Sequence, residues 1–160
     1  IKRGFSLSLV VLIPLLLTVL TVSGCTTDKN DLGLEPDLVL FDLKFFKDED
    51  HLKYTGVSNK SIFTNLKKIS DKNRDLIIRI PIIPGMTDNS ENLEGLSSVI
   101  EGLQRVIRLD ILPFHRTGFA KRTRMGMDNK LEGYRTPDEN HMMKIKQFFE
   151  KKGLHVRIGG

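Results

Sequence analysis

The chain has 160 residues, which is enough for one domain, or part of one, with an ordinary buried core. Hydrophobic residues make up 39% of it and charged residues 28%, a globular composition that excludes an intrinsically disordered chain. The net charge of +5 favours acidic partners, but the 25 Lys and Arg are scattered among 20 carboxylates without an aromatic-interleaved basic motif, so nucleic acid is not a predicted partner. A single cysteine excludes an internal disulfide framework, and also a metal cluster held by several cysteines of these residues alone.

Residues 1–35 differ in composition from the rest of the chain. Two basic residues precede an uncharged stretch at 4–27 that contains LVVLIPLLLTVLTV and ends in VSGC and two threonines. This pattern is typical of a lipoprotein export signal with Cys25 as the lipidated residue. The stretch is also long enough for a transmembrane helix, although Pro14 interrupts it, and a buried barrel strand is a third interpretation. The three interpretations stay open at this point.

From residue 37 onward, strand and helix patterns alternate, which predicts a parallel sheet with crossover helices. The apolar run 37–43 is the first predicted strand. Carboxylates at 48–50 then favour a short helix, because acidic side chains stabilise a helix N-terminus. The sequence YTGVSN at 54–59 breaks that helix.

A longer helix follows, with Ser58 or Asn59 as its N-cap. Its apolar residues recur at helical spacing, which predicts one face packed on the sheet. These residues are Ile62, Phe63, Leu66 and Ile69. Residues 75–83, DLIIRIPII, predict the second strand, which ends at the turn signal Pro84-Gly85.

A third helix is predicted after Asp88 or Asn89, and 105–112 is the third predicted strand. The buried stripe of that helix is Leu93, Leu96, Ile100 and Leu103. The segment 116–133, rich in Gly, Lys and Arg, is expected to be a long loop over the sheet edge.

The last helix is predicted from the sequence TPDE at 136–139, a capping box with proline at the first helical position. Its apolar face is Met142, Ile145 and Phe149, and it is expected to stop at Gly153. A short strand at 155–158 completes the predicted sheet.

Charged and polar residues gather where the predicted strands end, and the carboxyl ends of parallel strands meet at one edge of a sheet. They are Asp42, Lys44, Arg79 and His115. Lys44 suits a ligand carboxylate, Asp42 a cation or hydroxyl, and His115 a hydrogen bond, so together they favour a zwitterionic small molecule. Blander interpretations stay open: a strand-end ion pair between Asp42 and Lys44, a hydrogen-bonded loop histidine at 115, and a buried ion-pair role for Arg79.

Several motifs occur in order along residues 37–160: DLVLFDLK, KYTGVSN, NLKKIS, IIRIPIIPGMTDN, LDILPFH and VRIGG. In this order the chain resembles the carboxyl-terminal half of a glycyl-radical enzyme activating enzyme, of the pyruvate formate-lyase activating enzyme family in the radical SAM superfamily. The fold that this implies is α/β, a partial (β/α) barrel of the radical SAM type with parallel strands and crossover helices.

The resemblance also implies an activity. Such enzymes are oxidoreductases of the [formate-C-acetyltransferase]-activating type: they bind a 4Fe-4S cluster, reductively cleave S-adenosyl-L-methionine, and abstract hydrogen from a backbone glycine of a partner glycyl-radical enzyme such as a formate-lyase. A flavodoxin or ferredoxin-type reductant, anaerobic conditions and a cytoplasmic location follow from the same resemblance. It does not identify the partner enzyme.

The resemblance assigns the residues at the strand ends as S-adenosylmethionine contacts. Asp42, Leu43 and Lys44 match the family's contact on its fourth strand, and His115 matches the contact after the sixth. Arg79 is expected to line the same cavity, and Asp42 is also a candidate ligand for a monovalent cation. No residue of the chain is assigned as catalytic, and none as an iron–sulfur ligand.

The 160 residues contain neither the cluster-binding C-x3-C-x2-C motif nor the GGEP turn of the family. We therefore expect a fragment, with an anomalous segment at 1–35 and the carboxyl-terminal half of a partial barrel at 36–160, which is inactive by itself. The alternative is a lipid-anchored envelope protein with a non-enzymatic α/β binding domain, which reaches the membrane only if the first 25 residues act as a signal.

Overall fold

The computed structural model describes residues 36–115 and 133–160. The apolar segment 1–35, including Cys25, and nearly all of the predicted loop at 116–133 lie outside the described residues. The elements in chain order are β1 (Leu38–Asp42), α1 (Asp48–Thr55), α2 (Lys60–Asp71), β2 (Asp75–Ile82), α3 (Ser90–Glu101), β3 (Val106–Pro113), α5 (Glu139–Glu150) and β4 (Val156–Ile158). Strand and helix alternate, as the sequence predicts.

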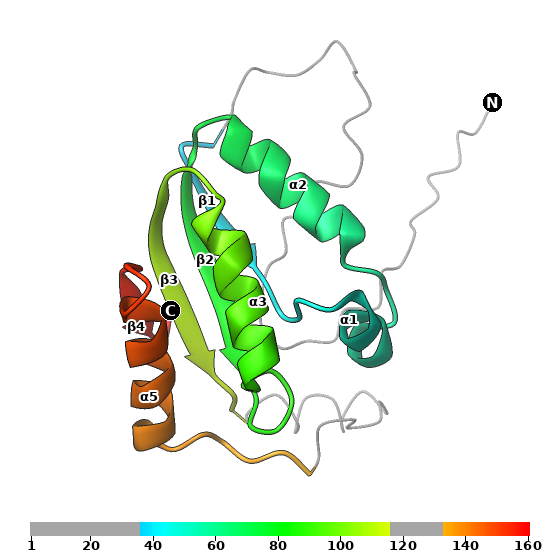
Figure 1. The fold of residues 1–160 in the computed structure, drawn as a ribbon, viewed down its shortest axis with the longest axis vertical. Helices are drawn as coiled ribbons and strands as arrows, with labels where there is room; N and C mark the ends of the chain where they lie inside the picture. The colour runs from blue at the N-terminus through cyan, green and yellow to red at the C-terminus, as the bar shows by residue number, and fades with distance from the viewer. Residues whose placement is uncertain (1–35, 116–132) are drawn as a thin grey trace, which may run out of the picture. The chain divides into compact units, whose positions relative to one another are not determined.

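The described strands form one parallel sheet in the order β1-β2-β3-β4, with helices in each crossover (Figure 1). Sequential neighbours that pair in parallel through helical crossovers are the arrangement of a (β/α) barrel, and the predicted α/β class is confirmed. The apolar sequence of β2 explains its central place, because a parallel strand with a neighbour on each side is covered on both faces.

One face of the sheet carries the hydrophobic core. Alternate residues of β2 point to it, since successive side chains of a strand lie on opposite faces. The buried stripes of α2, α3 and α5 pack on the same cluster, and Figure 1 shows α3 running along β2. The core members are Leu43, Leu66, Leu76, Ile78, Ile80, Ile82, Leu93, Leu96, Ile100, Leu109, Ile111, Met142, Ile145, Phe149 and Val156.

Two predicted boundaries are wrong, for local reasons. The N-cap of α5 is Asp138, whose carboxylate accepts a hydrogen bond from the backbone N–H of His141 at 2.8 Å, so the capping box expected at Thr136 lies two residues too early. Pro137 is buried ahead of the helix and is not its first residue. The third strand starts at Val106 because Arg105 has φ 52, a left-handed conformation that ends the preceding turn.

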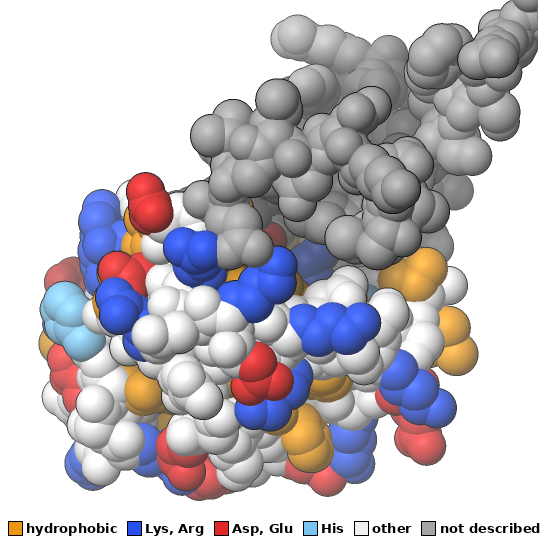
Figure 2. All heavy atoms as spheres, turned by 90° about the horizontal axis from the view of Figure 1, so that it is seen from above, with side chains coloured by type: hydrophobic (Ala, Val, Ile, Leu, Met, Phe, Trp, Pro, Cys, Tyr) orange, Lys and Arg blue, Asp and Glu red, His pale blue; other side chains and the backbone are white. Residues whose placement is uncertain are grey.

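On the face drawn in Figure 2, basic and acidic side chains are interspersed. Several of them form exposed ion pairs, for example Lys47 with Glu91 at 2.6 Å and Lys152 with Glu94 at 2.9 Å. Such pairs contribute little to stability, about 0 to 1 kcal/mol each. Within residues 36–115 and 133–160, every helix is too short or too polar to cross a membrane.

Candidate functional site

The face of the sheet opposite the core carries a row of charges, one from each strand. Asp42 of β1 is in register with Arg79 of β2, Arg79 with Asp110 of β3, and Asp110 with Arg157 of β4. Their sequence neighbours point into the core, so the four side chains share the other face. Acid and base alternate across the row, which places opposite charges next to each other and avoids like-charge contacts.

Asp42 and Arg79 form an ion pair across β1 and β2. Arg79 Nε donates to Asp42 Oδ1 at 2.9 Å, and the two side chains are 12% and 22% exposed. The ion-pair interpretation of Arg79 is therefore confirmed, and its partner is Asp42. The pair leaves Oδ2 of Asp42 as the carboxylate oxygen that is available to a ligand.

Asp110 is a buried carboxylate that we did not single out in the sequence. Its side chain is 1% exposed, and Arg108 on the same strand holds both of its oxygens, at 2.7 Å from Nε and 3.1 Å from Nη2. This hydrogen bonding raises the pKa of the Arg108 guanidinium. The sequence did contain a signal for this pair, an acidic residue inside the otherwise apolar run LDILP. A carboxylate that is buried in such a strand needs a basic partner.

Leu43 and Lys44 directly follow β1, and one is buried while the other is exposed. The Leu43 side chain is 2% exposed and belongs to the core, so only its backbone is available to a ligand. Lys44 lies two residues after Asp42, beyond the end of β1, and is exposed. Among residues 36–115 and 133–160 no carboxylate pairs with Lys44, so the strand-end ion pair with Asp42 is not formed there.

His115 lies at the carboxyl end of the sheet, two residues beyond β3, and is exposed. The buried Phe114 anchors this end, because its backbone N–H donates to Ile82 O at 3.0 Å and keeps the chain beside β2. Lys44 and His115 thus follow two strands that β2 separates, and strands two places apart lie about 10 Å from each other. The structure brings Asp42 and Arg79 into contact and puts Lys44 and His115 at the same edge of the sheet.

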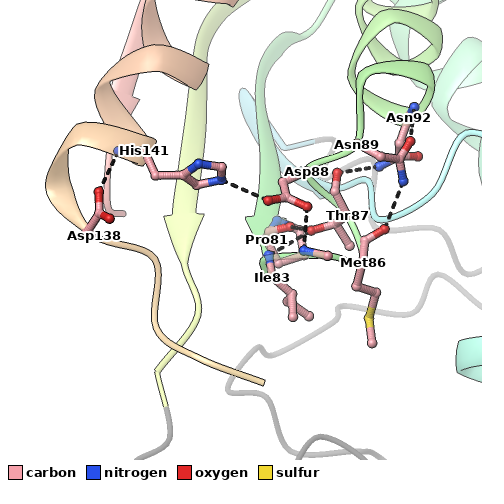
Figure 3. Close-up of polar contacts among 10 residues, drawn as sticks. Pro81, Ile83, Met86, Thr87, Asp88, Asn89, Asn92, Asp138 and His141 are labelled. Atoms are coloured by element: carbon pink, nitrogen blue, oxygen red, sulfur yellow. Dashed lines mark hydrogen bonds and ion pairs between the residues drawn. The ribbon is translucent and has the colours of Figure 1, made fainter. Parts of the chain in front are cut away.

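The loop after β2 has a fixed shape at this edge (Figure 3). Thr87 is buried, and its hydroxyl donates to Pro81 O at 2.6 Å and accepts from the Ile83 N–H at 2.8 Å. Asp88 Oδ1 accepts from the Gly85 N–H at 2.7 Å. Asn89 caps α3 by accepting from the Asn92 N–H at 2.8 Å. These hydrogen bonds give the loop a fixed shape at the carboxyl end of β2.

The described residues do not fit an iron–sulfur cluster. No group of three His, Cys, Asp or Glu side chains within 36–115 and 133–160 is placed to hold a metal ion, and the cysteine of the sequence, Cys25, lies outside these ranges. The monovalent cation predicted at Asp42 stays a prediction. The strand-end residues offer an exposed ammonium, a carboxylate and an imidazole at the carboxyl end of the sheet, and the zwitterionic ligand predicted for them stays a prediction.

Parallel strands, crossover helices and polar residues at the carboxyl ends of the strands define an α/β protein of the (β/α)-barrel class. Its fold matches a domain of a pyruvate-formate lyase-activating enzyme from Bacteroides vulgatus ATCC 8482, with TM-score 0.63, 24% identity, and coverage of 78% of this chain and 68% of that one. It also matches a radical SAM methyltransferase from Sphaerobacter thermophilus, with TM-score 0.56 and 13% identity over 74% of this chain and 32% of that one.

Sequence comparison identifies the relatives. The chain is 34% identical over 128 residues to the (2S)-3-sulfopropanediol dehydratase activating enzyme of Klebsiella oxytoca, covering 77% of the chain and 40% of that protein. It is 30% identical over 140 residues to the pyruvate formate-lyase-activating enzyme of Staphylococcus epidermidis, covering 83% and 56%. It is 34% identical over 126 residues to the trans-4-hydroxy-L-proline dehydratase activating enzyme of Clostridioides difficile, covering 78% and 41%. No protein-family profile matches the chain.

Over most of its length, the chain is therefore homologous to the glycyl-radical enzyme activating enzymes. It spans about half of the length of these curated relatives.

Proposed function

We propose that the described domain forms the S-adenosylmethionine-binding side of a glycyl-radical enzyme activating enzyme, an oxidoreductase of the radical SAM type. The observation that carries the proposal is the placement of Asp42, Lys44 and His115 at the carboxyl edge of a parallel sheet, with Leu43 turned into the core. Ligands of α/β barrels bind at this edge. The sequence relatives, all named as activating enzymes, support the same assignment.

Each residue has a distinct task toward the ligand. Lys44 offers three N–H donors and a positive charge to the methionine carboxylate. Asp42 accepts from a ligand hydroxyl or amine through Oδ2, while Arg79 holds its other oxygen in place at 2.9 Å. His115 adds a hydrogen bond from the end of β3. When bound, S-adenosylmethionine supplies the hydrogen-abstracting chemistry toward a backbone glycine of the partner enzyme.

The cluster and the reductant belong to the proposal only as features of the complete enzyme. The described residues do not fit a 4Fe-4S cluster, so no step is assigned through it. The glycyl-radical enzyme as protein partner, the flavodoxin or ferredoxin-type reductant, the cytoplasmic location and the alternative of a lipid anchor at Cys25 remain predictions.

Calorimetric titration of the full chain with S-adenosylmethionine tests the proposal. We expect saturable binding, and we expect Lys44→Met to weaken it about tenfold or more, because a charge-assisted hydrogen bond contributes about 1.5–3 kcal/mol. Lys68→Met, which removes an exposed lysine in the last turn of α2, is the matched control and should keep the wild-type affinity. Absence of saturable binding to the full chain, or equal losses in both variants, would overturn the proposal.

A further inference from the structure

The segment Lys44–Phe46, which connects β1 to α1, has neither helix nor strand hydrogen bonding. We call it the post-β1 segment. Its three carbonyls and the Phe46 N–H are nevertheless partnered, because two buried asparagine side chains from other elements reach it. Asn59 precedes α2 and is 3% exposed, and Asn92 lies in the first turn of α3 and is 5% exposed.

The side-chain amide of Asn92 makes three hydrogen bonds, one as acceptor and two as donor. Its Oδ1 accepts from the Phe46 N–H at 2.7 Å, and its Nδ2 donates to Lys44 O at 3.1 Å and to Thr87 O at 2.8 Å. The side chain thus ties the post-β1 segment to the loop after β2 (Figure 3 shows the Thr87 contact). A buried amide with every group partnered has one favourable orientation.

Asn59 holds the same segment from the side of α2. Its Nδ2 donates to Phe45 O at 2.9 Å and to Phe46 O at 3.0 Å. Its own backbone N–H donates to Asp48 Oδ1 at 2.8 Å, so the asparagine itself is anchored. Although Asn59 stands at the N-cap position of α2, its side chain makes no capping hydrogen bond and is engaged with the post-β1 segment instead.

Packing on α3 limits the segment further. A β-carbon at Gly95 would overlap the Phe46 side chain at its Cβ, Cγ and Cδ1 atoms, so glycine is needed for this close approach. Phe45 is buried and stacks on Tyr54 of α1, with ring centroids 5.1 Å apart and an interplanar angle of 12°. Each of the three carbonyls of the segment thus accepts from one of the two asparagines, and the peptide unit between Phe45 and Phe46 is held by both.

We propose that Asn59 and Asn92 are positioning residues that fix the backbone of the post-β1 segment and thereby aim the Lys44 side chain at the ligand. The inference rests on the proposed function only in taking Lys44 as a ligand contact. Lys44 itself is exposed, so its direction depends on the backbone of the segment, in which Asn92 holds the Lys44 carbonyl and Asn59 holds the two carbonyls that follow. If the two asparagines served stability alone, loosening them would leave affinity for the ligand unchanged in the folded protein.

Amide hydrogen exchange in the full chain, followed by NMR, tests without any ligand whether the two asparagines hold the segment. Asn59→Ala leaves the acceptor of the Phe46 N–H, Asn92 Oδ1, in place, so faster exchange at Phe46 reports a looser segment and not a deleted bond. We expect a rise of about tenfold at Phe46 in Asn59→Ala and a larger one in Asn92→Ala, since each lost hydrogen bond contributes about 1 kcal/mol net. The Leu109 N–H, which donates to His155 O at 2.8 Å, reports on the fold and should keep its protection.

Titration of the same variants with S-adenosylmethionine completes the test. We expect each asparagine variant to bind about five- to tenfold more weakly, while Ile100→Val, a buried change farther along α3, binds like the wild type. Unchanged exchange at Phe46, or faster exchange with unchanged affinity, overturns the inference.

If the wild type itself shows no binding, the proposed function fails, and the exchange rates still decide whether the asparagines hold the segment. Asn92→Asp, which keeps the acceptor for Phe46 and loses the donor to Lys44 O, replaces Asn92→Ala if that variant does not fold.

Discussion

His141 and Asp88 join two elements that are far apart in the sequence. His141 Nε2 donates to Asp88 Oδ2 at 2.8 Å, and Asp88 lies in the loop after β2 whereas His141 lies in the first turn of α5 (Figure 3). Asp88 Oδ1 is engaged as well, with the Gly85 N–H. The carboxylate thus connects the loop after β2 to the helix that precedes β4.

We expect His141→Ala to lower the free energy of unfolding by about 0.5–1.5 kcal/mol, because one hydrogen bond to a largely buried carboxylate is lost. Urea denaturation measures the change. His155→Ala is the matched control, since that histidine is exposed and only its backbone carbonyl is used, by the Leu109 N–H. Equal stability of the two variants would show that the contact is not formed in solution.

The strands were predictable because their apolar runs are short and bounded. Residues 37–43, 75–83 and 105–112 were expected, and the structure has Leu38–Asp42, Asp75–Ile82 and Val106–Pro113. The helices were predictable for a similar reason, since their buried residues recur at helical spacing. Parallel pairing then placed the strand ends at one edge.

The contacts made by single polar side chains were not predictable from local sequence. Asn59 stands where a helix cap is expected, yet its amide donates to carbonyls 13 and 14 residues earlier. Asn92 reaches the Phe46 N–H, 46 residues away, and Asp42 pairs with Arg79 at a separation of 37. Such partners depend on how the crossovers pack, which a pattern of hydrophobic residues does not specify.

The acid stability of the α1–α2 region depends on Asp48. Its pKa is lowered from 3.8 by hydrogen bonds from the Ser58 hydroxyl and the Asn59 backbone N–H, at 2.6 and 2.8 Å. Because the folded pKa lies below the unfolded one, this carboxylate contributes stability above about pH 4, and the contribution is lost as pH falls through the lowered folded value. The free energy of unfolding, measured between about pH 6 and pH 2, should therefore fall less steeply with decreasing pH in Asp48→Asn than in the wild type. Glu49→Gln, an exposed change in the same turn, should follow the wild-type curve, and a parallel curve for Asp48→Asn would contradict the assignment.

The ion pair between Asp42 and Arg79 should be measurable by a double-mutant cycle with Asp42→Asn and Arg79→Gln. We expect a coupling energy of about 1–2 kcal/mol, more than for a surface pair, because both side chains are largely buried. Lys67 and Asp71 on α2, which are 59% and 51% exposed, provide the reference pair, with about 0.3–0.5 kcal/mol expected. A coupling no larger than that of the reference pair would mean that the charges of the row act independently.

Gly95 offers a test in which two effects oppose each other. Alanine is the better helix former by about 1 kcal/mol, so Gly95→Ala would stabilise α3 if nothing lay against it. Its β-carbon would instead overlap the Phe46 side chain close to the backbone, where the side chain cannot swing away, and we expect a net destabilisation of about 1–3 kcal/mol.

Gly102→Ala, at a position with φ −82 where the nearest atom is Val99 O at 3.5 Å, is the matched control and should be neutral or slightly stabilising. Chemical denaturation gives both values, and Phe46→Ala should make Gly95→Ala much less destabilising, since the overlaps with Cγ and Cδ1 are removed and only the contact with Cβ at 2.8 Å remains. A stabilising Gly95→Ala in the presence of Phe46 would refute the close packing of the post-β1 segment on α3.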